Sequence, residues 1–241
     1  MAKKPEVWLV QGRPLRMTVR RSARARHLRL NVSTRRGVVA VLPNGASRAE
    51  LTAMVHEAAD WLAVQADRHG VWDGPRRREW RDRDVLTLLG EPVTLVITPL
   101  AAGRRRPRAT LTDGQLRLDL PAADLLDPRP ALERWLRRFA GRELRRRTAL
   151  WSERTGLAPQ RVIVGERTSR WGSCSSRGTL SFCYRLVLAP AEVVDAVVVH
   201  ELCHLRHRNH GPRFKALVRA EYPDHDRQMD WLATHGHELE V

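Results

Sequence analysis

The sequence has few cysteines, few aromatic residues and no long hydrophobic run. Its 241 residues include only three cysteines, an odd and small number that argues against a disulfide framework and favours a reducing cytoplasm. The longest apolar stretch, Val38–Leu42, is far shorter than the roughly 18 residues that a membrane-spanning helix requires. The first residues also lack the pattern of a signal peptide. We therefore expect a cytoplasmic protein without a membrane segment.

Lysine is nearly absent, although the chain is strongly basic. Of the 43 basic residues only Lys3, Lys4 and Lys215 are lysines, so 40 are arginines, and the formal net charge is +16. A basic surface of this strength can attract the phosphates of nucleic acid. Arginine in place of lysine is also a bias of GC-rich genomes, and few aromatic residues lie among the arginines. We favour the compositional explanation and keep nucleic acid as a partner that the charge allows.

The N-terminal half of the sequence has the pattern of short strands. Alternating apolar and polar residues over 7–42, and again over 85–120, predict two groups of strands joined by tight turns. Between these groups Ser47 and Glu50 form a capping box, which predicts a helix that ends near Gly70. We detect no internal repeat in this half. It is expected to be β-rich with one helix.

In the C-terminal half, apolar residues recur with the period of an α-helix. A long apolar stripe predicts a helix from about Pro130 to Arg154, and a strand is expected at 180–188 before a further apolar helix. The whole pattern predicts an α+β fold. Its β-rich N-terminal part would cover residues 1–125, and a helical core with a small sheet would cover residues 126–241.

Two histidines with the spacing of metal ligands lie in the last apolar segment. His200-Glu201-Leu202-Cys203-His204 has the form H-E-x-x-H. On a helix this spacing places the two histidines one above the other, about 6 Å apart, so that both can bind one zinc ion. Glu201 lies about 100° round the helix, where it can take a proton from a water on the metal. The motif predicts a metal-dependent hydrolase with Glu201 as the general base.

A third protein ligand is needed to complete such a site. Three more histidines, His207, His210 and His225, follow the motif. His207 lies two helical turns from His200, about 10 Å along the axis, which one ion cannot easily bridge. The residues at 209–212 include Asn, Gly and Pro, which break the helix and let the chain turn back. We therefore expect His210 to be the third ligand.

These residues resemble the YgjP-like metallopeptidase-domain family, a relative of the SprT-like and WLM zincin domains. The resemblance covers nearly the whole chain and is strongest over residues 160–232, where the matching residues lie in the segments 170–175, 184–186, 189–190, 198–205 and 209–214. It implies a zincin-like core, one Zn²⁺ held by His200, His204 and His210, Glu201 as the base, and a protein or peptide substrate. Descriptions of the family also include a nucleotide pyrophosphatase activity.

Other residues of the same segments are candidates for contacts in the cleft. The turn that contains Trp171 and Ser173 can present a hydroxyl or a backbone donor to the substrate, or it can serve packing alone. Arg170, Tyr184 and Arg185 are candidate oxyanion contacts.

The sequence thus predicts a zinc-dependent metallopeptidase that cleaves peptide bonds with Glu201 as the base. One alternative is a metal-dependent nucleotide (UTP-type) pyrophosphatase, which would use the arginines but lacks a Gly-rich phosphate loop in the sequence. A second alternative is a nucleic-acid-associated protein with a structural metal. Its binding would depend strongly on salt and would survive the substitution Glu201→Gln.

Overall fold

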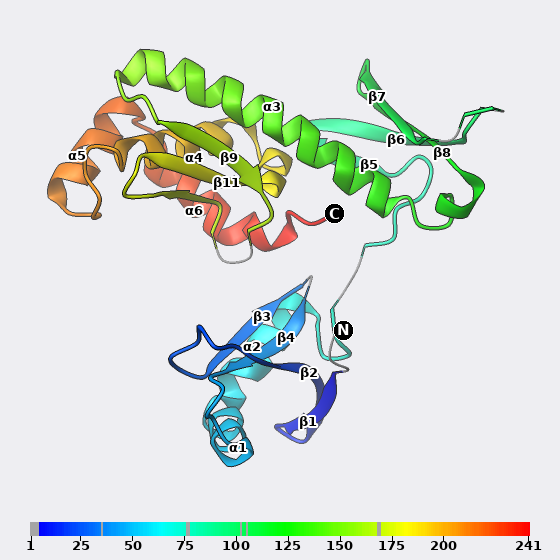
Figure 1. Ribbon diagram of the computed structural model, residues 1–241, viewed down its shortest axis with the longest axis vertical. Coiled ribbons are helices and arrows are strands. Elements are labelled where there is room, and N and C mark those ends of the chain that lie inside the picture. The colour runs from blue at the N-terminus through cyan, green and yellow to red at the C-terminus, as the bar shows by residue number, and fades with distance from the viewer. Residues whose placement is uncertain (1–4, 35, 76–77, 102, 105, 168–169) are drawn as a thin grey trace. The chain divides into compact units, whose positions relative to one another are not determined.

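A computed structural model gives the fold of the chain. Figure 1 shows it as a ribbon coloured from the N-terminus to the C-terminus. The residues that it describes are 5–34, 36–75, 78–101, 103–104, 106–167 and 170–241. They form two compact units, Met1–Arg78 and Glu79–Val241, each of which has its own hydrophobic core.

The first unit contains one four-stranded sheet and two helices. Its elements are β1 (Glu6–Val10), β2 (Arg13–Arg21), β3 (Arg29–Ser33), β4 (Gly37–Leu42), α1 (Arg48–Glu57) and α2 (Ala59–His69). The predicted capping box is confirmed, since the Ser47 hydroxyl accepts from the Glu50 amide and the Glu50 carboxylate accepts from the Ser47 amide. The predicted single helix is interrupted at Ala58, where α1 ends and α2 begins.

The second unit contains a second four-stranded sheet, a three-stranded sheet and the remaining helices. Its strands are β5 (Val85–Leu88), β6 (Glu91–Pro99), β7 (Arg108–Thr112), β8 (Gln115–Leu120), β9 (Arg161–Gly165), β10 (Gly172–Cys174) and β11 (Thr179–Cys183). Its α-helices are α3 (Arg129–Thr155), α4 (Ala191–Cys203), α5 (Pro212–Glu221) and α6 (His225–His235). Three short 3₁₀ helices are η1 (Ala122–Asp124), η2 (Tyr184–Leu188) and η3 (Gly236–Glu238).

The long helix α3 organises the second unit. In Figure 1 the sheet β5–β8 lies near its N-terminal end and the strands β9–β11 lie near its C-terminal end. Leu95 and Leu118 of the four-stranded sheet share one buried core with Leu132 and Leu136 of α3. The predicted division after residue 125 therefore falls inside this unit, because the sequence pattern does not show on which helix a sheet packs. The α+β fold class is confirmed.

The two four-stranded sheets have the same topology. Their strand orders are β1-β2-β4-β3 and β5-β6-β8-β7, and in both the two inner strands are parallel while each outer strand is antiparallel to its neighbour. Each first hairpin turns through a residue with positive φ, Gln11 or Leu89, followed by Gly-x-Pro. This repeat is not visible in the sequence, because the two sheets share their strand order and their turn residues but little residue identity.

Helix α4 is held by packing on more than one side. Its valines, such as Val193, Val194 and Val198, are fully buried, which offsets the mediocre helix propensity of β-branched residues. The strand expected at 180–188 ends at Cys183, and the chain continues as η2 into Pro190, the N-cap of α4. In the described part of the chain no helix combines the length and hydrophobicity needed to cross a bilayer.

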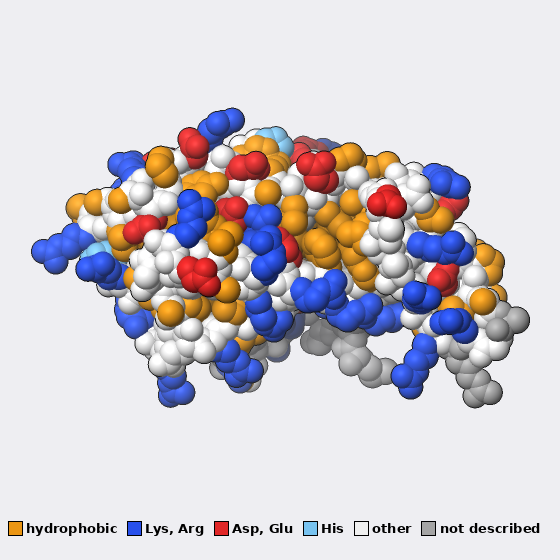
Figure 2. Space-filling model, turned by 90° about the horizontal axis from the view of Figure 1, so that it is seen from above, with side chains coloured by type: hydrophobic (Ala, Val, Ile, Leu, Met, Phe, Trp, Pro, Cys, Tyr) orange, Lys and Arg blue, Asp and Glu red, His pale blue; other side chains and the backbone are white. Residues whose placement is uncertain are grey.

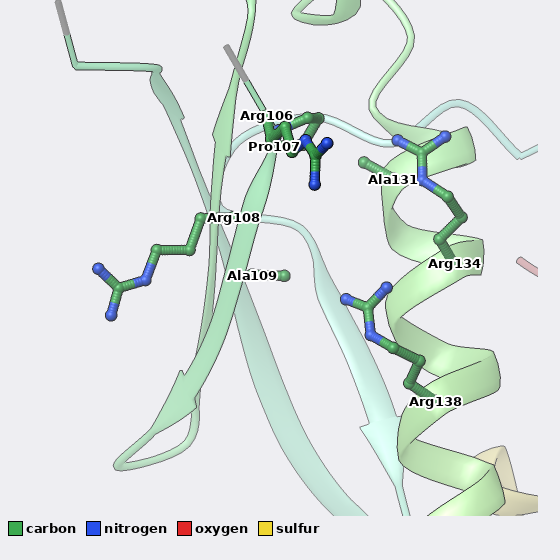
Figure 3. A pocket seen from close by; sticks show the side chains of 7 residues that line it. All are labelled: Arg106, Pro107, Arg108, Ala109, Ala131, Arg134 and Arg138. Carbon is green, nitrogen blue, oxygen red and sulfur yellow. The ribbon is translucent and has the colours of Figure 1, made fainter. Parts of the chain in front are cut away.

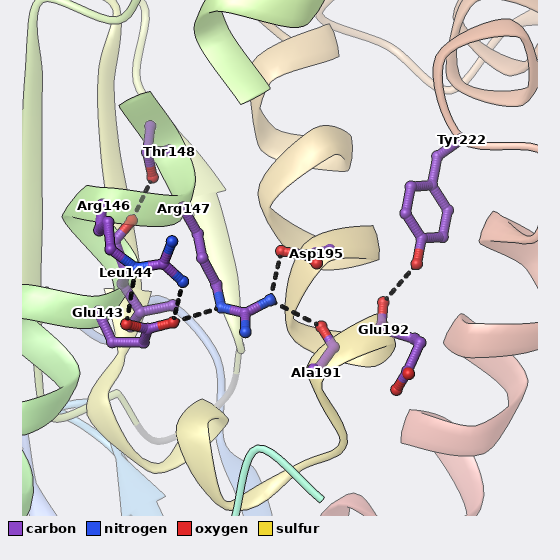
Figure 4. Close-up of polar contacts among 9 residues, drawn as sticks. All are labelled: Glu143, Leu144, Arg146, Arg147, Thr148, Ala191, Glu192, Asp195 and Tyr222. Atoms are coloured by element: carbon purple, nitrogen blue, oxygen red, sulfur yellow. Dashed lines mark hydrogen bonds and ion pairs between the residues drawn. The ribbon is translucent and has the colours of Figure 1, made fainter. Parts of the chain in front are cut away.

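A polar network also joins α3 to α4 (Figure 4). The guanidinium of Arg147 donates to the Glu143 carboxylate at 2.7 Å and to the Ala191 carbonyl at 3.3 Å, and it lies 2.7 Å from the Asp195 carboxylate. Hydrogen bonds from Arg146 and Arg147 hold the pKa of Glu143 below its ordinary value. This network anchors the first turn of the helix that carries the H-E-x-x-H motif.

Candidate metal centre

Three histidines converge at the C-terminal end of α4. His200 lies in its last turn, His204 is its C-cap, and His210 lies in the loop before α5. One ring nitrogen from each lies within 4.8 Å of those of the other two, and the Nε2 atoms of His200 and His210 are 3.1 Å apart. Two nitrogen ligands of one tetrahedral zinc ion would be about 3.3 Å apart. The structure therefore brings the three predicted ligands together, and the separation of His200 and His210 is close to that expected for a shared ion.

The ring of Phe214 forms one wall of this histidine cluster. Phe214 lies in the first turn of α5 and is almost completely buried. It stacks on His204, with centroids 4.4 Å apart, and meets His200 and His210 edge-on at 5.0 Å and 4.9 Å. A rigid apolar ring against three imidazoles limits their rotation and excludes water from that side.

Hydrogen bonds behind the cluster select the nitrogens that face inward. The Nδ1 atom of His204 donates to the carbonyl of His207 at 2.9 Å. The Nδ1 atom of His200 lies 3.0 Å from Nε2 of His225, whose Nδ1 lies 3.1 Å from the Asp226 carboxylate. An ionised Asp226 accepts from His225, so Nε2 of His225 in turn accepts from His200. Both motif histidines then keep Nε2 free for a metal.

The protonation of these histidines also suits metal binding. Burial, reinforced by the neighbouring histidines, lowers the pKa of His200 to about 3. Burial also lowers the pKa of His204 from its ordinary value. Both imidazoles are therefore neutral near pH 7, which is the form that binds a metal ion.

Glu201 is a buried carboxylate with an unused oxygen. The residue is 6% exposed, and within the described residues its Oε2 atom has no hydrogen-bond partner. Its other oxygen and its side-chain carbons pack against Gly172, where an added Cβ would lie only 2.5 Å from Oε1. Burial raises the pKa of Glu201 to about 7, and the positive charge of Arg170 opposes that rise. Such a carboxyl group can exchange a proton near neutral pH.

The donor set fits a zinc ion. Imidazole nitrogens are ligands that zinc prefers, and three of them with one open position are typical of catalytic zinc sites. A buried carboxylate next to the first ligand, with an oxygen left without a partner, fits a site completed by water and a cation.

Two further predicted residues, Trp171 and Ser173, lie beside the centre in packed positions. The carbonyl of Trp171 accepts from the Cys183 amide at 2.8 Å, and its ring packs on Gly236. Ser173 pairs with Ser181 in the ladder between β10 and β11. Of the two roles considered for this turn, the structure supplies direct evidence for packing.

Tyr184 and Arg185 have well-defined partners within the second unit. Tyr184 is fully buried, with the guanidinium of Arg137 over its ring at 4.6 Å. Arg185 donates to the carboxylate of Glu240 at 2.5 Å and to the carbonyl of Arg167 at 3.1 Å. These contacts show packing for Tyr184 and tethering for Arg185, and the oxyanion role of both residues stays a prediction. Arg170, in contrast, is exposed and acts on Glu201 through its charge.

The sequence reasoning missed the contact of Gly172 with Glu201 and the place of His225 behind His200. Gly172 lies between Trp171 and Ser173, and an added Cβ there would meet the side chain of Glu201. His225 was considered as a ligand, and it lies behind His200. In the sequence, a histidine followed by aspartate at the start of a helix was the available signal for a supporting pair.

The site brings three histidines together near a buried carboxylate, and the comparison with known families gives the class of protein. The family comparison agrees: the YgjP-like metallopeptidase domain matches residues 26–235, and the chain belongs to this family. No curated protein matches the chain. Among solved structures, the metallopeptidase zymogen of Pyrococcus abyssi abylysin is similar, with 18% identity and a TM-score of 0.35, over 38% of this chain and 92% of that one. A likeness of that extent carries no functional argument.

Proposed function

We propose that this protein is a zinc-dependent peptidase in which His200, His204 and His210 hold one Zn²⁺ and Glu201 is the general base. The observation that carries the proposal is the convergence of three imidazoles on one point, with the buried carboxylate of Glu201 next to the first of them in the chain. Family membership supports a protein or peptide as the substrate. The three free thiols, Cys174, Cys183 and Cys203, fit a reducing cytoplasm.

Each residue of the centre has a defined task in this mechanism. A bound zinc ion would lower the pKa of a water molecule and polarise the peptide carbonyl. Glu201, with a pKa of about 7, accepts the proton of the attacking water and returns it to the leaving amine. Phe214 and His225 hold the imidazole rings in place. Gly172 leaves room for the carboxylate.

The experiment compares the zinc-loaded wild type with Glu201→Gln on a complex peptide library, with new N-termini identified by mass spectrometry. We expect cleavage by the wild type and none above background by the variant, which should keep one zinc per chain. Glu153→Gln on the exposed face of α3 makes the same chemical change and should cleave like the wild type. Equal cleavage by Glu201→Gln, or none by the zinc-loaded wild type, would contradict the proposal.

A further inference from the structure

A cavity lined by several arginines lies between strand β7 and the first turns of α3 (Figure 3). Its volume is about 260 Å³. Arg106, Arg134 and Arg138 point their guanidinium groups toward it, while Ala109 and Ala131 contribute only methyl groups. We call these five residues the arginine pocket. The side chain of its neighbour Arg108 points away (Figure 3).

The pocket is separate from the metal centre. It lies at the N-terminal end of α3, beside β7, whereas the histidines lie near α5 at the other end of the second unit (Figure 1). The pocket would therefore bind a ligand of its own, apart from any ligand of the metal centre.

The three arginines of the pocket have no acidic partner among the residues that the structure describes. Other arginines of α3 do: Arg137 pairs with Glu133, and Glu143 pairs with Arg146 and Arg147. These two acidic residues of α3 thus pair with arginines that do not line the pocket. Three like charges around one cavity repel each other, and an anion between them would remove that repulsion.

The chemistry of the pocket fits a phosphate group. Guanidinium groups bind phosphate oxygens with paired, directional hydrogen bonds, and three of them suit an anion with more than one negative charge. The alanines keep the cavity open without adding polar groups that would select an organic ligand. The cavity is smaller than a typical site for a drug-sized molecule, which spans about 300–1,000 Å³. Its size therefore suits a phosphate or pyrophosphate moiety.

We propose that the arginine pocket binds a phosphate group, either of a nucleic-acid strand or of a free polyphosphate. The exposed Arg142 lies four residues after Arg138, so arginines recur at positions 134, 138 and 142, about 6 Å apart along the helix. Figure 2 shows one face of the molecule, over which Lys and Arg side chains are spread with Asp and Glu side chains among them. A row of cations that continues beyond the pocket favours a strand.

The test removes the three charges together in the full chain, as Arg106→Gln/Arg134→Gln/Arg138→Gln. A matched control, Arg16→Gln/Arg20→Gln/Arg29→Gln, removes three exposed arginines of the first unit. Fluorescence anisotropy measures binding of a labelled 12-nucleotide single strand at several salt concentrations, and calorimetry measures binding of pyrophosphate. Thermal melting checks that all three proteins are folded.

We expect the pocket variant to bind the strand at least tenfold more weakly, with the salt dependence of log K reduced by about 2, since each lost contact removes about 0.7. The control should stay within threefold of the wild type. Loss of pyrophosphate binding alone would identify a free polyphosphate as the ligand of the pocket. The proposal is overturned if the pocket variant binds both probes like the wild type, if the control loses as much, or if the wild type binds neither.

Discussion

The Nδ1 atom of His200 lies 3.0 Å from the Nε2 atom of the buried His225, and this contact decides which nitrogen of His200 faces the metal centre. Asp226 extends the chain of contacts, since its carboxylate lies 3.1 Å from Nδ1 of His225 and also accepts from Arg219 at 2.8 Å. A ligand orientated in this way loses less freedom when a metal binds. The start of α6 thus contributes to a site built on α4.

His225→Ala should weaken zinc binding by about 10- to 100-fold, because it removes the acceptor that orientates His200. His225→Gln, whose amide oxygen can accept the same hydrogen bond, should recover part of the loss. A competition titration against a chromophoric chelator gives the affinities. His235→Ala on the same helix, where the ring stacks on Trp231, should bind zinc like the wild type. Equal affinity in the wild type and His225→Ala would show that the contact has no positioning role.

Gly172→Ala should lower hydrolysis by about 100-fold while the protein keeps its zinc, because the new Cβ would displace the carboxylate of Glu201. Peptide cleavage and metal content, measured on the same preparation, separate the two effects. Gly165→Ala in β9 is the control, since no atom lies within 4 Å of its added Cβ. If Gly172→Ala cleaves at the wild-type rate, the close contact between Gly172 and Glu201 does not matter for the reaction.

Glu143→Gln should destabilise the protein by about 1 kcal/mol at pH 7, because it removes charge-assisted hydrogen bonds to Arg146 and Arg147. The pKa of Glu143 is lowered in the folded state, so its stabilisation is present above the ordinary value of 4.5 and is lost as the pH falls through the lowered pKa. Urea unfolding of both proteins between pH 7 and pH 3 measures this. A difference that is the same at every pH would contradict the assignment, and the exposed Glu153→Gln should be as stable as the wild type at pH 7.

The candidate site could be predicted from the sequence because its geometry is local. His200 and His204 are one helical turn apart, and His210 follows a break that turns the chain back, so short-range rules bring all three together. Their roles as ligands, and that of Glu201 as a base, stay predictions until metal and activity are measured.

The environment of the neighbouring residues could not be predicted, because it depends on contacts distant in sequence. Arg185 pairs with Glu240, which lies 55 positions later, and Tyr184 is buried under a side chain of α3. The continuous strand expected at 180–188 fails for the same reason, since η2 packs against α3 and α4.

Zinc content of the purified chain tests the central claim most directly. Mass spectrometry of zinc-reconstituted, dialysed protein should find about one zinc per chain in the wild type and far less in His210→Ala. His207→Ala is the matched control, because that residue contributes its carbonyl to His204 and should keep about one zinc per chain. A wild type that retains no zinc, or a His210→Ala variant that retains one equivalent, would contradict a three-histidine centre.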